Sequence, residues 1–413
     1  MKKFIKLIFS SVLALSVAVF SGVVYYDATL SDSYYVAKGT SLTLSGNSVL
    51  QCKPNGNSLT VGKSNSASVG AHETTVSLFG LFPIKTVSVT ETEETEVVVL
   101  GTPFGLKIFT EGVLVVGYSD VDTENGTKNP ALEAGVKTGD IILKINGEDV
   151  TENSDVQSII TKSQGKPCEL ELKRDGNTFS VTLTPVLSVT DKVYKMGLWV
   201  RDSSAGIGTL TFYSPTLKVA AGLGHGICDT DTGELIPFDS GQFVKAEIVG
   251  IKKSSGKVTG ELKGVFSGGD IAQLAGNEIT GVYGCDCSEI TDGESAMPIA
   301  LKQEVKTGKA CILTTVDDNE PCLYECEIEK VYHNDSAKIK NMVIKITDEE
   351  LLAKTGGIVQ GMSGSPVIQN GKLVGAVTHV LVDDPTKGYA IFAENMLETA
   401  QGVAESNKLK DAS

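Results

Sequence analysis

The segment from Gly361 to His379 constrains the local fold of this chain more than any other stretch. It begins with a glycine-framed serine, Gly361-Met362-Ser363-Gly364-Ser365-Pro366, and continues through an apolar run, Asn370-Gly371 and a second apolar run. Asn-Gly between two apolar runs is the strongest short-range signal for a β-hairpin. The sequence therefore predicts a serine loop with a hairpin that returns beside it.

The chemistry of this segment indicates a nucleophile, and we interpret Ser363 as that nucleophile. A serine hydroxyl needs an imidazole within reach and amide donors aimed at the developing oxyanion. The flanking glycines let the amides of Gly361 and Ser363 converge as an oxyanion hole. His225 lies between two glycines in a pattern typical of a tight loop that presents its ring, so it is the candidate general base. His333 lies in a polar stretch typical of a surface.

Length and composition predict an ordinary globular protein with several domains. The chain has 413 residues, a length that exceeds what one hydrophobic core usually supports. Of these residues 41% are hydrophobic and 21% are charged. The net charge of −15 argues against a nucleic-acid partner, because neutralising phosphates requires a basic surface. The eight cysteines do not follow a standard zinc spacing. We expect free thiols or one or two disulfides, no metal site and no cofactor.

The N-terminal segment 1–26 is predicted to be a signal sequence or membrane anchor. Lys2, Lys3 and Lys6 precede an uncharged apolar run from Leu7 to Tyr26. Roughly 20 residues at about 1.5 Å each would cross about 30 Å of hydrocarbon. The positive end is expected to stay in the cytoplasm, which places the rest of the chain on the extracytoplasmic side. We favour a retained anchor over a cleaved signal.

Two further units are predicted before the region that carries the serine. Residues 27–99 alternate apolar and polar residues and predict a small β-rich module. Residues 100–187 contain Ala134-Gly135-Val136, Gly139-Asp140-Ile141 and Ile145-Asn146-Gly147. This combination resembles a bacterial PDZ domain, an α+β fold that captures an extended chain end.

The resemblance to PDZ domains implies a peptide-binding groove. We expect free amides of a loop at Gly105 to Lys107 to hold a carboxylate, while the peptide adds a strand beside Leu106 and Ile108. A helix from about residue 154 would close the groove with Val156, Ile159 and Ile160 as candidates. The alternative is that these three residues form only the core face of that helix.

Residues 188–413 are β-rich and long enough for two packed barrels with a site between them. The stretch from Gly361 to His379 resembles the C-terminal barrel of chymotrypsin-like peptidases, and a terminal helix is expected from about residue 394. The resemblance implies a mainly β fold with a double β-barrel peptidase domain. It also implies that Thr378, His379 and Val380 form a wall of the substrate pocket, opposite Gly388-Tyr389-Ala390.

The choice of the acid that orients His225 stays open from the residues alone. Asp270 and Asp286 lie between base and nucleophile, where chymotrypsin-like peptidases usually place the acid. Thr347-Asp348-Glu349-Glu350 has the spacing of a helix cap. The run Gly356-Gly357-Ile358-Val359-Gln360-Gly361-Met362-Ser363-Gly364-Ser365-Pro366, however, resembles the stage IV sporulation protein B peptidases, and this resemblance implies that Asp348 is the acid.

The same resemblance covers nearly the whole chain and implies a specific role. It implies a membrane-tethered serine endopeptidase exported into the space between the forespore membranes. Its expected substrate is the extracytoplasmic part of a membrane regulator, whose cleavage releases an intramembrane metalloprotease that matures a mother-cell sigma factor. It also implies self-cleavage aided by the PDZ domain. A general envelope quality-control peptidase and a PDZ binding module with an inactive peptidase fold are the alternatives.

Overall fold

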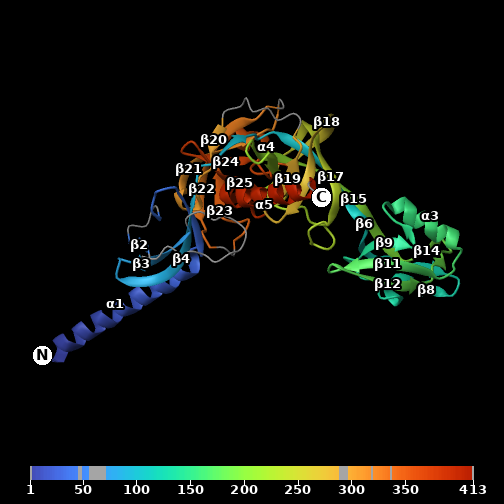
Figure 1. The fold of residues 1–413 in the computed structure, drawn as a ribbon, viewed down its shortest axis with the longest axis horizontal. Coiled ribbons are helices and arrows are strands. Elements are labelled where there is room, and N and C mark those ends of the chain that lie inside the picture. Colours follow the sequence, from blue (N-terminus) through green and yellow to red (C-terminus); the bar gives the residue numbers. More distant parts are fainter. Residues whose placement is uncertain are drawn as a thin grey trace.

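The structure, a computed structural model, describes residues 2–44, 49–54, 71–287, 296–317, 320–334 and 337–411. The molecule is elongated: helix α1 (Lys2–Thr29) projects from one end, a strand-rich body fills the middle, and a smaller unit with α3 (Asn153–Ser163) forms the other end (Figure 1). The predicted mainly β fold class is confirmed.

Helix α1 is long and apolar enough to cross a membrane. The stretch Phe4–Thr29 passes this test by length and composition alone, with a mean hydropathy of 2.4. Its last turns are not free, because Val19, Val23 and Tyr26 pack against the core of the N-terminal sheet. The helix therefore runs directly into the first folded unit.

The N-terminal module is a four-stranded sheet in the order β1-β4-β3-β2. Its strands are β1 (Ser33–Ala37), β2 (Leu50–Pro54), β3 (His72–Leu78) and β4 (Phe82–Thr92). The short helix η1 (Lys302–Glu304) joins this module to the body. Lys302 Nζ donates to Ser31 Oγ at 2.8 Å, and Gln303 Nε2 donates to the Tyr35 carbonyl at 2.6 Å. The module is thus held to the body by buried polar contacts.

The first barrel of the body closes through one long-range pairing. Strands β6, β17, β18, β19, β16 and β15 follow one another in the sheet, and an additional pairing of β6 with β15 completes the ring. Strand β5 (Glu96–Val99) pairs β15 near its end. The ring strands are β6 (Pro103–Tyr118), β15 (Leu198–Ser214), β16 (Val219–Gly222), β17 (Phe238–Lys252), β18 (Glu261–Glu278) and β19 (Gly281–Cys285).

The PDZ unit is inserted into this first barrel. The first half of β6 pairs with both β15 and β17, whereas Val113 and Leu114 in its second half pair with β9. The chain then builds the PDZ unit and returns to the barrel as β15. The predicted boundaries at residues 100 and 188 thus differ from the structure, where the barrel starts before the PDZ unit. The main elements of the PDZ unit are α2 (Pro130–Glu133), β9 (Ile141–Ile145), α3, β11 (Cys168–Arg174) and β12 (Asn177–Leu183). Its short strands are β7 (Val121–Thr123), β8 (Gly126–Lys128), β10 (Glu148–Asp149), β13 (Val186–Leu187) and β14 (Tyr194–Lys195).

The second barrel is closed in the order β21-β22-β23-β26-β25-β24. The predicted hairpin is its β24–β25 connection: Asn370 and Gly371 have φ of +52° and +74°, and Gln369 pairs with Lys372. Two positive φ angles are what a type I′ turn requires. The strands are β21 (Gly308–Thr314), β22 (Cys322–Val331), β23 (Met342–Ile346), β24 (Pro366–Gln369), β25 (Lys372–Leu381) and β26 (Asp384–Phe392), with α4 (Glu349–Thr355), the terminal α5 (Ala393–Asp411) and β20 (Ala296–Pro298) beside them.

A buried ion pair anchors the Gly139-Asp140 turn of the PDZ unit. Asp140 is fully buried, and its two oxygens accept from Nε and Nη2 of Arg174 at 2.5 and 2.7 Å. The amide of Lys137 donates to the same carboxylate at 2.7 Å. Removing one partner of such a pair leaves an uncompensated buried charge.

We therefore expect Arg174→Ala to lower the free energy of unfolding of the PDZ unit by about 2–3 kcal/mol. The matched control is Lys173→Ala, whose partner Glu111 is exposed, and it should cost less than about 1 kcal/mol. Urea unfolding followed by the fluorescence of Trp199, the single tryptophan, measures both. Equal effects of the two substitutions would contradict the conclusion that the ion pair of Arg174 and Asp140 anchors this turn.

Candidate active site

The Ser363 loop lies between α4 and β24 and approaches the first barrel closely. Gly361 and Gly364 have φ of +97° and +94°, a region that favours glycine. A Cβ at Gly364 would lie 2.0 Å from the carbonyl oxygen of Thr209 and 2.5 Å from the amide nitrogen of Leu223. Glycine is required at Gly364 because the loop packs backbone against backbone.

Strand β15 holds this loop through hydrogen bonds from two threonines. The amide of Thr209 donates to the carbonyl of Ser363 at 2.9 Å, and its hydroxyl donates to the carbonyl of Gly361 at 2.9 Å. The hydroxyl of Thr211 donates to the carbonyl of Gly364 at 2.7 Å. Both threonines are buried. The first barrel therefore sets the conformation of the nucleophile loop in the second.

His225 follows β16 in a loop that packs against the same region. Gly224 has φ of +67°, and a Cβ there would lie 3.1 Å from Thr378 Cγ2. Nδ1 of His225 lies 2.9 Å from the carbonyl oxygen of Gly226. A carbonyl can only accept, so Nδ1 carries the proton and Nε2 keeps a lone pair. Burial lowers the pKa of His225, and the Gly226 hydrogen bond opposes this in part.

Ser363 is beside this histidine loop but its hydroxyl has another partner. Oγ of Ser363 donates to the carbonyl of Thr378 at 2.8 Å. The ring of His379, the next residue, lies 4.7 Å from the His225 ring between centroids. Within the described residues, the amides of Gly361 and Ser363 donate to no protein group. In this structure the Ser363 hydroxyl is therefore bonded to a backbone carbonyl and not to the His225 imidazole.

The proposed contact between Asp348 and His225 is absent in this structure. Asp348 is the N-cap of α4: its oxygens accept from the amides of Leu351 at 3.0 Å and Glu325 at 3.2 Å. The helix-cap interpretation of Thr347-Asp348-Glu349-Glu350 is therefore the one that agrees with the structure. A backbone carbonyl, that of Gly226, orients the imidazole instead.

The other two candidate acids do not contact the imidazole either. Asp270 is exposed on β18 and accepts from Gln242 Nε2 at 3.2 Å. Asp286 is exposed just after β19. The sequence could not indicate that the Gly226 carbonyl accepts from His225, because every residue has a backbone carbonyl.

The predicted pocket wall lies on β25. Thr378 is buried, Val380 is partly buried and His379 is exposed. Val380 pairs with Gly388 of β26, so the two predicted walls are neighbouring strands. Although His379 is exposed at the surface, partial desolvation of its ring, and then the charge of His225, lower its pKa to about 4. His379 is therefore neutral near pH 7 and offers the pocket a hydrogen-bonding group without a charge.

The prediction that Gly105 to Lys107 form a carboxylate-binding loop is wrong. Gly105, Leu106, Lys107 and Ile108 lie in the middle of β6 and pair with β15 on one side and β17 on the other. No edge is open there for a peptide. The glycine is needed for a different reason, because a Cβ at Gly105 would lie 2.4 Å from the Phe266 ring.

The groove of the PDZ unit lies elsewhere, between α3 and the segment Tyr194–Val200. It is a cavity of about 450 Å³ whose lining includes Val156 and Ile160 of the helix. Both are also buried in the PDZ core, as is Ile159, which does not line the groove. The opposite wall was missed in the sequence. Its signal is Met196-Gly197-Leu198, a glycine between apolar residues just before a strand.

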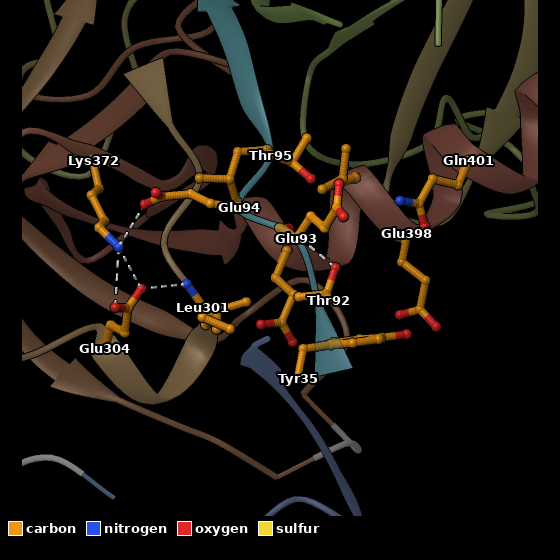
Figure 2. Close-up of a pocket in the computed structure, with 14 residues that line it drawn as sticks. Tyr35, Thr92, Glu93, Glu94, Thr95, Leu301, Glu304, Lys372, Glu398 and Gln401 are labelled. Carbon is orange, nitrogen blue, oxygen red and sulfur yellow. Dashed lines mark hydrogen bonds and ion pairs between the residues drawn. The ribbon is translucent and has the colours of Figure 1, made fainter. Parts of the chain in front are cut away.

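A separate cavity lies where the N-terminal module meets α5. Figure 2 shows its lining, in which Lys372 bridges Glu94 at 3.4 Å and Glu304 at 3.1 Å. Glu93 and Glu398 face the same space. None of the residues predicted for catalysis lines it. Within the described part of the chain, no group of three or more His, Cys, Asp or Glu residues is arranged to hold a metal ion, and all eight cysteines are free thiols.

Two family models match this chain. The SpoIVB peptidase S55 model covers residues 192–397, and the PDZ domain model covers residues 112–184. This part of the chain belongs to the SpoIVB peptidase S55 family. The protein is a serine peptidase with a PDZ domain, and the family region contains both His225 and Ser363.

Curated relatives match only short stretches of this chain. The regulator of sigma-W protease RasP of Bacillus subtilis is 33% identical over 26% of this chain and 22% of its own length. A putative zinc metalloprotease of Bartonella henselae is 30% identical over 19% and 22%, respectively. The chain spans less than a quarter of the length of these two relatives.

Solved structures match weakly. The HtrA-type protease AlgW with a decapeptide has 16% identity and a TM-score of 0.30 over 50% of this chain and 55% of that one. The Rv3671c protease in its inactive form has 13% identity and a TM-score of 0.24 over 48% and 84%.

The burial of His225 predicts the pH dependence of the peptidase. Only the neutral imidazole accepts a proton from Ser363, and a lowered pKa keeps it neutral in more acidic solution. We expect kcat/KM to be half-maximal at a pH below about 6.5 and to be flat above it. A midpoint above about 7 would instead indicate a carboxylate beside the ring.

Asp348 can be tested through the identity of its replacement. If it acts as the helix cap, Asp348→Ser keeps a capping oxygen and should retain activity within about threefold, while Asp348→Ala should lose about 1 kcal/mol of stability. A triad acid cannot be replaced by serine, because a hydroxyl does not stabilise an imidazolium. Peptide hydrolysis and thermal unfolding of both variants separate the roles; equal inactivation by Ser and Ala would restore Asp348 as the acid.

Proposed function

We propose that this protein is a membrane-anchored serine endopeptidase that carries a signal between compartments during sporulation. Its substrate is the extracytoplasmic part of a membrane regulator of an intramembrane metalloprotease, and its cleavage leads to processing of a mother-cell sigma factor. The family match supports the sporulation role. The convergence of the Ser363 and His225 loops on one another carries the proposal of peptidase chemistry.

The catalytic cycle follows from the positions of these groups. Ser363 rotates away from the Thr378 carbonyl and attacks the scissile carbonyl, while Nε2 of His225 takes its proton. The amides of Gly361 and Ser363 stabilise the oxyanion, and the Gly226 carbonyl keeps the imidazole in the required tautomer. His225 then protonates the leaving amine, and water hydrolyses the acyl-enzyme.

The apolar helix α1 supports a location at a membrane, with the peptidase on the extracytoplasmic side. In a sporulating cell this would be the space between the two forespore membranes. The PDZ domain supports recognition of a protein substrate through a chain end. Self-cleavage in the same compartment is part of the proposal, because a neighbouring copy presents a substrate at high local concentration.

An active-site probe tests the nucleophile directly. A fluorophosphonate should label the wild type and fail to label Ser363→Ala. The control is Ser365→Ala, whose hydroxyl is buried and bonds Thr314 Oγ1 at 2.8 Å, and which should be labelled like the wild type. Self-cleavage of the purified full chain should follow the same pattern. Labelling or self-cleavage of Ser363→Ala would overturn the assignment.

A further inference from the structure

Strand β15 connects the PDZ groove to the nucleophile loop and has one open edge. From Leu198 to Thr209 it pairs with β6 on one side. Its pairing with β16 on the other side begins only at Leu210. Within the described part of the chain, no strand pairs with the second edge between these points. The unpaired edge of β15 therefore leads from the PDZ groove to the Ser363 loop and is available to an extended peptide.

From Ser203 to Thr209 the backbone groups along this edge point outward in a regular pattern, whereas bulges interrupt the pairing with β6 at Trp199/Val200 and Arg201/Ser203. The amide of Thr209 donates to Ser363, away from β6, whereas the amide of Leu210 donates to Thr102. Backbone groups alternate along a strand, and the register with β6 is regular from Ser203 to Thr209. The outward groups next to Thr209 are thus those of Ile207 and Ala205. They are placed to pair with a chain that enters the active site.

This edge lines a cavity that reaches the predicted oxyanion hole. The cavity has a volume of about 510 Å³ and lies between residues 205–207 of β15 and residues 261–266 of β18. Gln360 and Gly361 form its inner end. The predicted pocket wall at Thr378 belongs to β25 of the other barrel. One side of the scissile bond would contact the predicted wall at Thr378. The cavity is therefore available to the part of the substrate on the other side of that bond.

The far end of the edge is the groove of the PDZ unit. Leu198, Trp199 and Val200 line that groove opposite α3. Trp199 is 63% exposed, which is unusual for a large aromatic side chain without a partner. At the start of this strand the amide of Gly197 donates to no protein group within the described residues. A free backbone amide before a strand is what captures a terminal carboxylate in a strand-addition site.

We propose that the peptidase measures its cleavage site from the carboxyl end of the substrate. The terminal carboxylate is held at Gly197, the last residues add to β15 opposite α3, and the chain runs antiparallel to β15 back to Ser363. From Leu198 to Thr209 the strand spans roughly 35 Å at about 3.3 Å per residue. Cleavage then falls about ten residues before the chain end. This inference rests on the proposed peptidase function and adds to it a fixed spacing between the cleavage site and the free carboxyl end of the substrate.

The direction of the chain is consistent at both ends. If the carboxylate of a peptide lies at Gly197 and the peptide runs antiparallel to β15, the residues before its carboxyl end lie beside Ala205 and Ile207. The residues that follow the scissile bond would therefore occupy the cavity beside Gly361. The opposite direction would place an amino terminus at Gly197, where a free amide has nothing to donate to.

Peptides with a variable tail test this ruler. They share one scissile sequence, taken from the self-cleavage site, and carry extended tails of roughly 4, 8, 12 and 16 residues before a free carboxyl end. We expect kcat/KM of the full chain to rise about tenfold between the shortest tail and the tail of about 12 residues. Amidation of the chain end should abolish the rise.

Two variants test whether the substrate follows this strand edge. For each variant we compare kcat/KM for the long-tailed peptide with kcat/KM for the short-tailed peptide, as a ratio. Trp199→Ala removes a wall of the groove, and Ala205→Pro removes an outward amide from the open edge; both should bring the ratio toward one. Leu187→Ala, an exposed residue of the PDZ unit outside the groove, should keep the ratio of the wild type.

The outcomes separate this inference from the function on which it rests. Cleavage of every tail at the same rate, amidated or free, would overturn the ruler and leave the peptidase assignment intact. A preference for the longest tail without an optimum near the predicted length would also contradict it. Absence of cleavage together with absence of fluorophosphonate labelling would mean that the proposed function has failed.

Discussion

The contact between the Ser363 loop and strand β15 is the interaction on which the rest of the structure depends. It requires Gly364, because a side chain there would collide with the backbone of Thr209 and Leu223. It is satisfied by Thr209 and Thr211, which bond three carbonyls of the loop from a buried strand. Buried polar groups of this kind are costly when unpaired. The two barrels are therefore joined at the Ser363 loop.

The insertion of the PDZ unit follows from the same strand. Strand β6 leaves the first barrel and β15 returns to it, so the PDZ unit is attached by two paired strands and not by a flexible linker. The groove wall at Tyr194–Val200 falls in the peptidase family region, while α3 falls in the PDZ family region. Neither match alone contains the whole groove. The groove is therefore built from both family regions.

Local patterns predicted the elements whose geometry depends on near neighbours. The Asn370-Gly371 hairpin, the N-terminal apolar helix and the terminal helix α5 formed where the residues indicated, since turn chemistry and hydropathy act over a few positions. The helix cap at Thr347-Asp348 is another such pattern, and the structure agrees with it and not with the role that the resemblance implies. The local patterns did not predict the pairing of Gly105 to Ile108 with β15 and β17, which joins distant segments.

The sequence by itself determined which residues have the chemistry of a nucleophile and a base, and that glycines surround both. Only the tertiary structure decided their partners: the Gly226 carbonyl at His225, the Thr378 carbonyl at Ser363, and β15 and β17 on either side of Gly105 to Ile108. The physical reason is that backbone amides and carbonyls are the same in every residue. Which of them pair is set by the closure of the first barrel, a contact between segments far apart in the chain.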